Sequence, residues 1–209
     1  MLNTYRKDPC RTLSIPYWKN KRIKLPPNMK IAHHSEYAAE NHPEYRDEPY
    51  FRLFHDLKHI EDFSLNNISI VTAATADIPT LADIINRSYT DLSVTIPQLE
   101  GYTRTEVYCP DLWVMAVDCS TSTVVGCGIA DLDREVGEGI LEWIQVLPEY
   151  RRQGIGQAIV TELLRRMAGL ADFATVSGKV NSVTQPEKLY RKCGFCGNDI
   201  WHILTKIEK

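Results

Sequence analysis

The chain of 209 residues and 23.9 kDa has the length of one ordinary domain, or of one domain with an added arm. Its hydrophobic fraction of 44% and its charged fraction of 24% exclude a disordered or collagen-like protein. The net charge of -3 argues against binding to nucleic acid, because proteins that bind it usually carry a basic excess.

The sequence gives no sign of a membrane or an oxidising compartment. No stretch approaches the roughly 18 apolar residues of a membrane span, and no apolar run follows the basic residues of Met1–Asp8, as a secretory signal would require. Six cysteines are too few for a disulfide scaffold in a chain of this length. We therefore expect a cytoplasmic protein with reduced thiols.

The N-terminal part differs in composition from the rest. Its prolines prevent long regular elements over much of residues 1–65. The basic stretch from Lys19 to Lys30 alternates with apolar residues, which favours an exposed edge strand, with an anion-binding surface as the alternative. From about Glu48 to Glu61, apolar residues recur at helical spacing behind a capping Asp47, which predicts a helix. Residues 1–66 are thus expected to form a strand and helix arm, and residues 67–209 a separate domain.

From Ile68 onward the pattern is α/β. The predicted strands are Ile68–Ala73, Leu112–Val117, Val124–Asp131, Gly139–Val146, Phe173–Val180 and Ile200–Ile207. The predicted helices run from a cap at Asp77 to near Asp91, over Gly154–Met167 and over Pro186–Lys192. Strands joined first by hairpins and then by helices imply a mixed, mostly antiparallel sheet flanked by helices.

The segment between the strand ending at Val146 and the next helix has the features of an anion-binding turn. The start of a helix presents backbone N–H groups without intrahelical partners, and its dipole favours negative charge. Gly154 and Gly156 lack side chains, so a phosphate can approach the backbone. Arg151 and Arg152 add positive charge beside it.

Two other nucleotide-binding motifs fit this turn poorly. The chain lacks the Gly-Lys-Ser/Thr sequence of a P-loop. A dinucleotide fingerprint would need a third glycine where Ile159 stands. A pair of glycines by itself is weak evidence, because such pairs are often only turn or packing residues.

Two sequence blocks together resemble a known family. Val146-x-Pro148-x-x-Arg151-x-x-Gly154-Ile155-Gly156 resembles the coenzyme A signature of the GNAT superfamily of N-acetyltransferases. Downstream, Leu189-Tyr190-x-Lys192-x-Gly194-Phe195 resembles the last block of that family's pattern, in the expected order. The resemblance covers about Ile68–Lys209. It implies the acyl-CoA N-acyltransferase fold, with acetyl-CoA as the donor and a small-molecule or peptide amine as the acceptor.

The resemblance also implies where the donor lies. The N–H groups of Gln153, Gly154, Ile155, Gly156 and Gln157 would hold the pyrophosphate, with Arg151 and Arg152 beside them. Pantetheine would lie where the strand around Ile144–Val146 splays from the strand over Thr175–Lys179. Asn181 matches an asparagine that often contacts the cofactor in similar proteins. The interval from Asn181 to Tyr190 is longer than usual and contains Pro186, so Asn181 as a plain turn residue is the alternative.

Two side chains are candidates for proton transfer. Glu142 precedes Val146 by four residues, so regular alternation places both on one face of the strand. Its apolar neighbours favour a carboxyl group suited to a general base, while an ion-paired strand glutamate is the alternative. Tyr190, carried over from the family's block, would be the acid that protonates the departing thiolate. A tyrosine that only packs is the alternative.

Metal binding is not expected. Cys193 and Cys196 have zinc-knuckle spacing but no second pair. His55 and His59 are spaced as in a metalloprotease helix, but an aspartate replaces its glutamate and both should face water. His33-His34 is interpreted as a surface pair.

Two functions follow from these observations. The first is transfer of an acetyl group to an amine by direct attack in a ternary complex. The alternative is a non-catalytic acyl-CoA-binding or regulatory module, because a fold does not fix a function. The arm is expected to cover the acceptor side or to build a homodimer contact, since its apolar residues need a partner surface.

Overall fold

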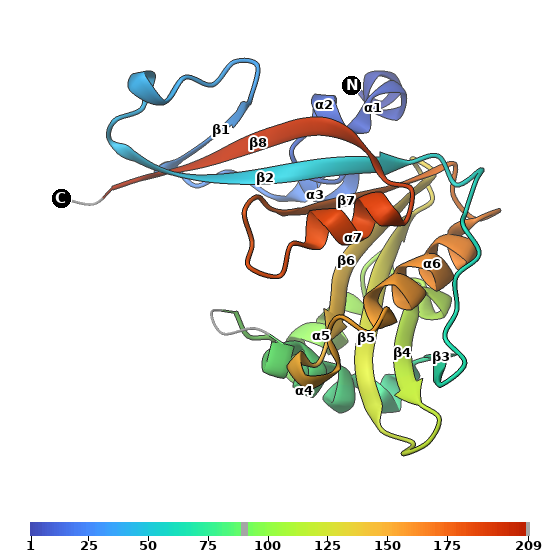
Figure 1. The fold of residues 1–209 in the computed structure, drawn as a ribbon. Helices are drawn as coiled ribbons and strands as arrows, with labels where there is room; N and C mark the ends of the chain where they lie inside the picture. Colours follow the sequence, from blue (N-terminus) through green and yellow to red (C-terminus); the bar gives the residue numbers. More distant parts are fainter. Residues whose placement is uncertain (89–91, 208–209) are drawn as a thin grey trace. The chain divides into compact units, whose positions relative to one another are not determined.

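The computed structural model describes residues 1–88 and 92–207, which form two compact units. Unit 1 comprises Met1–His55, Thr175–Arg191 and Phe195–Lys209, and unit 2 comprises Asp56–Ala174 and Lys192–Gly194. Figure 1 shows the elements coloured along the chain. Both ends of the sequence therefore belong to unit 1, while its middle builds unit 2.

Unit 2 contains four consecutive antiparallel strands, β3 to β6. Their bounds are β3 (Ile68–Thr72), β4 (Trp113–Asp118), β5 (Val124–Asp133) and β6 (Glu138–Val146). Its helices are α4 (Ile78–Ser88), α5 (Ile96–Tyr102) and α6 (Ile155–Met167), with short 3-10 turns η2 (Thr75–Asp77), η3 (Pro110–Leu112) and η4 (Pro148–Tyr150). β7 (Phe173–Lys179) begins in unit 2 and continues into unit 1.

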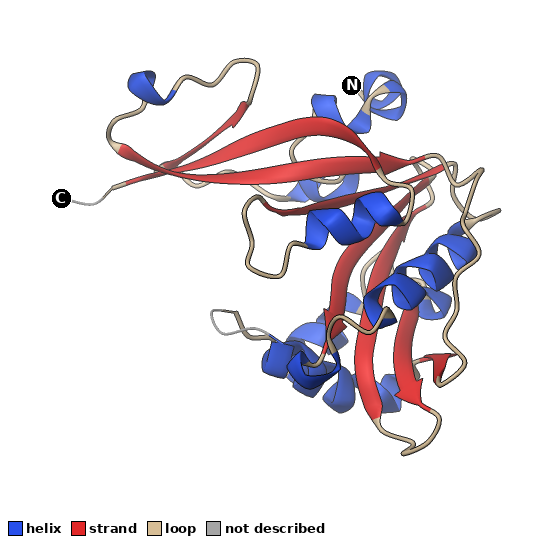
Figure 2. Ribbon diagram, viewed as in Figure 1, coloured by secondary structure: helices blue, strands red, loops and turns tan. Residues whose placement is uncertain are grey.

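Helices α4 and α6 both pack on β5 and β6 (Figure 2). The buried side of α4 meets alternate strand residues, among them Trp113, Met115 and Ile129. The intervening residues face α6: a Cβ at Gly128 would lie 2.5 Å from Cγ2 of Ile159. Because successive side chains of a strand point to opposite faces, the two helices cover opposite faces of this sheet. The absence of a side chain at Gly128 permits the close approach of α6.

Unit 1 is built around β8 (Cys196–Lys206), which pairs antiparallel with β1 (Met29–His33) on one side and with β2 (Tyr45–His55) on the other. Its remaining elements are α1 (Leu2–Lys7), α2 (Pro9–Thr12), α3 (Tyr17–Arg22), the 3-10 turn η1 (Ala39–Asn41) and most of α7 (Pro186–Lys192). On its other edge β2 is followed by β7, where the N–H of Val180 donates to the carbonyl of Pro49 over 2.9 Å.

The strand order of the whole chain is β1-β8-β2-β7-β6-β5-β4-β3. The prediction of a mixed, mostly antiparallel sheet flanked by helices is confirmed, and each strand predicted after Ile68 is present within a few residues of its expected bounds. Among the described residues, no helix is both long and apolar enough to cross a membrane.

The predicted helix over Glu48–Glu61 is wrong. The segment up to His55 is the strand β2, in which Tyr50 pairs with Trp201 and Glu48 with Ile203. Phe51, Arg52, Leu53 and His55 are all buried, so both faces of this end of β2 are covered. Pairing along the length of β8 outweighs the local helical pattern, because strand formation depends mainly on the neighbouring strands.

The predicted edge strand in the basic stretch is correct only at its end, because Lys30 lies in β1, which is at one edge of the sheet. Lys19, Lys21 and Arg22 lie in the short helix α3, and the strand β1 begins later, at Met29. Asp77 lies at the start of the helical segment as predicted, where its carboxylate accepts from the N–H of Ala74 over 2.8 Å, and α4 begins at the next residue. α4 is described to Ser88, and its predicted end near Asp91 lies outside the described residues. The boundary predicted after residue 66 stays a prediction, although residues 1–55 clearly contribute strands to unit 1.

Candidate active site

The turn between β6 and α6 has the local structure expected of an anion-binding site. The 3-10 turn η4 leads to Arg152 and then to Gly154, which have positive φ angles of 63° and 86°. Gly154 is the N-cap of α6, and no side chain caps the helix there. Backbone N–H groups at the start of this 13-residue helix are therefore available to an anionic ligand.

Gly154 is required for two separate reasons. Its left-handed conformation is costly for residues with a Cβ. In addition, a Cβ at this position would lie 3.1 Å from Cζ of Phe63 and 3.6 Å from the methyl groups of Leu65. The start of α6 is therefore in contact with the segment that precedes β3, inside the same unit.

The two arginines of the turn differ in what they contact. Arg151 donates from Nε to the carbonyl of Val146 over 3.1 Å and from a terminal nitrogen to the carbonyl of Ser88 over 2.8 Å. Its guanidinium thus ties the end of β6 to the end of α4. Arg152 is exposed. Arg152 is therefore the arginine better placed to meet an anion, whereas Arg151 shapes the turn.

The other predicted donor-binding residues of unit 2 would act through the backbone. Ile155 and Gln157 are buried in the unit, while Gln153 is exposed and Gly156 is half-buried. Ile144 and Val146 are half-buried near the end of β6. The structure thus places the residues from Ile144 to Gln157 on one strand end, one turn and one helix start of the same unit.

Glu142 lies at a β-bulge in β6. Ile129 pairs with Trp143 and the next residue of β5 pairs with Leu141, so Glu142 is the extra residue of the bulged strand. The prediction that Glu142 and Val146 share a face assumed an uninterrupted strand, and that assumption is wrong. Bulges re-aim side chains and are frequent beside active sites. Glu142 is half-buried, and its role as the base stays a prediction.

Tyr190 lies in unit 1, on α7, within an aromatic cluster. It is buried, with its ring centroid 5.9 Å from that of Phe195 in a T-shaped arrangement and 6.2 Å from that of Phe51. Such contacts hold the ring in one orientation. They account for its burial by packing, and its role as the acid stays a prediction.

Asn181 occupies the turn after β7, where it is exposed and has a φ of 61°. Asparagine tolerates this left-handed conformation better than most residues. This explains the residue as part of a turn, and its contact with a cofactor stays a prediction.

The predicted surface positions of two histidines are wrong, because strand pairing buries both of them. His55 is buried in β2 and His33 at the end of β1. With His34 and Asp199, His33 forms a group whose possible ligand atoms lie within 4.8 Å of one another. However, Nε2 of His33 lies 2.9 Å from the carboxylate of Asp199, and the Nδ1 atoms of both histidines accept from backbone N–H groups. All three side chains of this group therefore already have hydrogen-bond partners within the protein.

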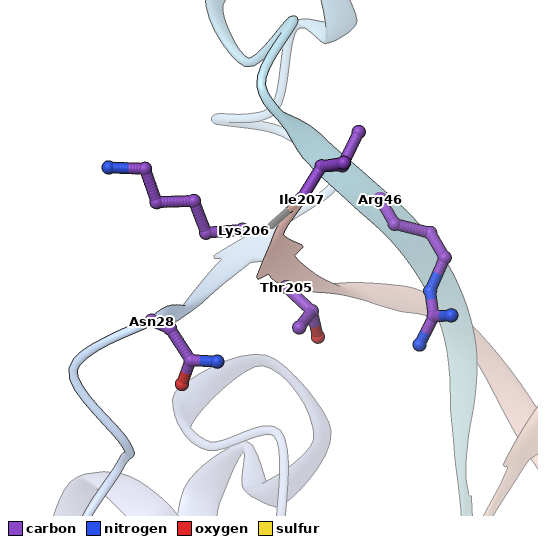
Figure 3. A pocket seen from close by; sticks show the side chains of 5 residues that line it. All are labelled: Asn28, Arg46, Thr205, Lys206 and Ile207. Carbon is purple, nitrogen blue, oxygen red and sulfur yellow. The ribbon is translucent and has the colours of Figure 1, made fainter. Parts of the chain in front are cut away.

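A separate hollow of about 270 Å³ lies in unit 1, where β1, β2 and β8 meet near their ends (Figure 3). Its lining residues are Asn28, Arg46, Thr205, Lys206 and Ile207. The side chains of Arg46 and Lys206 extend to opposite sides in Figure 3, so the two cations do not converge on a common ligand position.

The arrangement of helices around these strands, with an uncapped glycine turn at the start of α6, defines a protein of the acyl-CoA N-acyltransferase fold. Residues 110–196 match the family model described as an acetyltransferase (GNAT) domain. The resemblance to the GNAT superfamily that the two sequence blocks indicate is therefore confirmed for this part of the chain.

Solved structures with this fold share little sequence with the chain. A GCN5-related N-acetyltransferase from Sphaerobacter thermophilus is 18% identical, with a TM-score of 0.68, 90% of this chain covered and 63% of that one. A Drosophila protein is 15% identical, with a TM-score of 0.59, 81% of this chain covered and 54% of that one. The ribosomal-protein-S18-alanine N-acetyltransferase from Escherichia coli is 18% identical, with a TM-score of 0.53, 68% of this chain covered and 95% of that one.

The chain thus spans less than two thirds of the first two of these proteins. No curated protein matches the sequence.

Sequence reasoning missed three residues beside the start of α6. Phe63 and Leu65 contact Gly154, and Ser88 supplies a carbonyl to Arg151. No local motif marks these residues, because each acts through a contact that only the folded chain creates.

Proposed function

We propose that this protein transfers the acetyl group of acetyl-CoA to an amine acceptor by direct attack in a ternary complex. The observation that carries the proposal is the uncapped, glycine-led start of α6 within the segment that matches a GNAT domain. Coenzyme A offers a pyrophosphate, and a helix start without a capping side chain offers N–H donors to such an anion. The donor set therefore fits the cofactor.

In this proposal the backbone N–H groups from Gln153 to Gln157 bind the pyrophosphate, and the half-buried end of β6 lines the pantetheine. Bound acetyl-CoA supplies an activated acyl group as a thioester. Arg151 keeps the turn in shape through its two carbonyl contacts, while Arg152 adds positive charge from the solvent side. The acceptor is an amine, as the predicted reaction class requires.

The acceptor must lose a proton before it attacks. An amine with a pKa around 10 is neutral in only about one of a few thousand molecules at pH 7, which corresponds to roughly 4–5 kcal/mol. Glu142 is proposed to accept this proton, directly or through a water molecule. Its position at the bulge of β6 supports the assignment, because a bulge turns one side chain out of the regular alternation of the strand.

The second proton transfer concerns the leaving group. The thiol of coenzyme A has a pKa near 8.5, so its thiolate leaves more readily when an acid protonates it. Tyr190 is proposed as that acid. Its ring is held by Phe51 and Phe195, which supports a fixed orientation of its hydroxyl group.

The donor site is tested by thermal denaturation with and without acetyl-CoA. The cofactor should raise the melting temperature, and Gly156→Glu should abolish the rise by placing a carboxylate at the helix start. Gly101→Glu introduces the same group on α5, where a Cβ would have no neighbour closer than 4.0 Å, and should leave the rise intact. An undiminished rise in folded Gly156→Glu protein would place the pyrophosphate elsewhere.

The non-catalytic alternative is separated by turnover. Purified protein is incubated with acetyl-CoA and a panel of amines, aminoglycosides and peptides, and release of free thiol and acetylated product are both measured. Product formation supports the enzyme. Slow thioester hydrolysis that no amine accelerates would instead support a binding or regulatory module.

A further inference from the structure

A short linker, defined as Asp56–Asn67, lies against α6 within unit 2. Asp62 forms an ion pair with Arg165 near the C-terminal end of the helix. Phe63 and Leu65 contact Gly154 at its start. The linker is therefore held at two points on α6, one of them the turn proposed to bind the pyrophosphate.

Phe63 also lies beside a positive charge. The ammonium group of Lys192 is 5.9 Å from the centroid of the Phe63 ring, a cation–π distance. Phe63 is half-buried and Lys192 is exposed. The start of α6 is thus flanked by one aromatic ring and one ammonium group that the proposed catalytic steps do not use.

Coenzyme A continues beyond its pyrophosphate into a ribose that carries a 3′-phosphate and an adenine base. An aromatic side chain stacks on a base irrespective of hydrogen bonding, and an ammonium group attracts a phosphate. In coenzyme A the ribose of the adenosine is attached directly to the pyrophosphate. A pyrophosphate bound at Gly154 would therefore place the adenosine near Phe63, whose Cζ would lie 3.1 Å from a Cβ at Gly154.

We infer that the linker completes the nucleotide end of the donor site, with the Phe63 ring stacking on adenine and Lys192 pairing with the 3′-phosphate. This inference rests on the proposed function, since it takes acetyl-CoA as the donor. It assigns the linker a role in selecting a nucleotide-bearing donor over a plain pantetheine thioester.

Direct calorimetric binding tests the inference without an acceptor, using coenzyme A, 3′-dephospho-coenzyme A and pantetheine. Phe63→Leu keeps an apolar side chain against Gly154 but removes the aromatic face. It should weaken both nucleotide ligands by about 5- to 100-fold, the range of base stacking, and should leave pantetheine unchanged. Lys192→Gln should reduce the preference for coenzyme A over its 3′-dephospho form. Lys188→Gln, an exposed lysine of the same helix, should reduce neither.

The outcomes separate this inference from the proposed function. Normal binding of coenzyme A to Phe63→Leu would overturn the subsite and leave the function standing. Equal weakening of all three ligands would also overturn it, because Phe63 would then act only by packing on Gly154. If the wild-type protein binds none of the ligands, or if Gly156→Glu leaves binding intact, the proposed donor site itself fails.

Discussion

Replacing Arg151 by methionine removes two hydrogen bonds that join β6 to α4, while it keeps much of the side chain's apolar length. The guanidinium donates over 3.1 Å to the carbonyl of Val146 and over 2.8 Å to that of Ser88. A hydrogen bond to a charged group contributes about 1.5–3 kcal/mol, and the lower end applies because Arg151 is only half-buried. The hydroxyl of Ser88, 3.4 Å from the Val146 carbonyl, offsets part of the loss.

We therefore expect Arg151→Met to lower the free energy of unfolding by about 2–3 kcal/mol. For a protein of this size one kcal/mol shifts the melting temperature by about 2–4 °C, so the expected decrease is about 4–12 °C. Arg152→Met is the matched control, because the neighbouring side chain is exposed. Its melting temperature should stay within about 2 °C of the wild type, as for most surface substitutions.

Thermal denaturation of both variants, with and without acetyl-CoA, separates structural from ligand-binding effects. Arg151→Met should melt earlier yet still respond to acetyl-CoA. Arg152→Met should melt normally but respond less, since its charge faces the solvent beside the turn. If Arg151→Met melts like the wild type and loses only its response to the cofactor, the carbonyl contacts contribute little. The assignment of Arg151 as a structural residue would then be wrong.

Three further predictions concern the catalysts and the thiols. Once an acceptor is known, Glu142→Gln should reduce kcat/KM by about 10²–10⁴ and flatten the acidic limb of the pH–rate profile; an intact limb would assign the base elsewhere. Tyr190→Phe should lower kcat with little change in acetyl-CoA affinity, and the loss should shrink for donors with better leaving thiols, whereas a purely structural tyrosine would affect every donor equally. Burial raises the pKa of Cys127 to about 12, so at pH 8 its thiol stays protonated, and Ellman's reagent should modify only the exposed Cys119 and Cys196 before unfolding.

The structure changes the expected role of the N-terminal residues. They were predicted to form an arm with an amphipathic helix, whereas β2 pairs with β8 from Tyr45 to Phe54 and carries the buried Phe51 and Leu53. Deleting residues 1–66 would remove β1 and β2, the strands on both sides of β8. We expect the truncated protein to lose unit 1, not merely to change its acceptor preference; a truncation that retains wild-type thermal stability would contradict this.

The sequence by itself determined the elements whose signals are local. The apolar strand up to Val146, the glycine turn and the amphipathic helix that follows them are consecutive, so their order and spacing predict both the fold class and an anion-binding turn. The short helix over Pro186–Lys192, which contains Tyr190, was likewise predicted from its local sequence and is present as α7. Helix starts, turns and alternation depend on neighbours within a few residues, which the sequence displays directly.

Only the tertiary structure decided features that depend on residues distant in sequence. Pairing with β8 made residues 45–55 a strand and buried His55, although their local spacing favours a helix. The bulge at Glu142 reflects register with β5, and Arg151 finds its carbonyl partner Ser88 63 positions away in sequence. Phe63 reaches Gly154 only because the chain folds back along α6. Such contacts are set by packing and by strand register, and no periodicity within either partner segment encodes them.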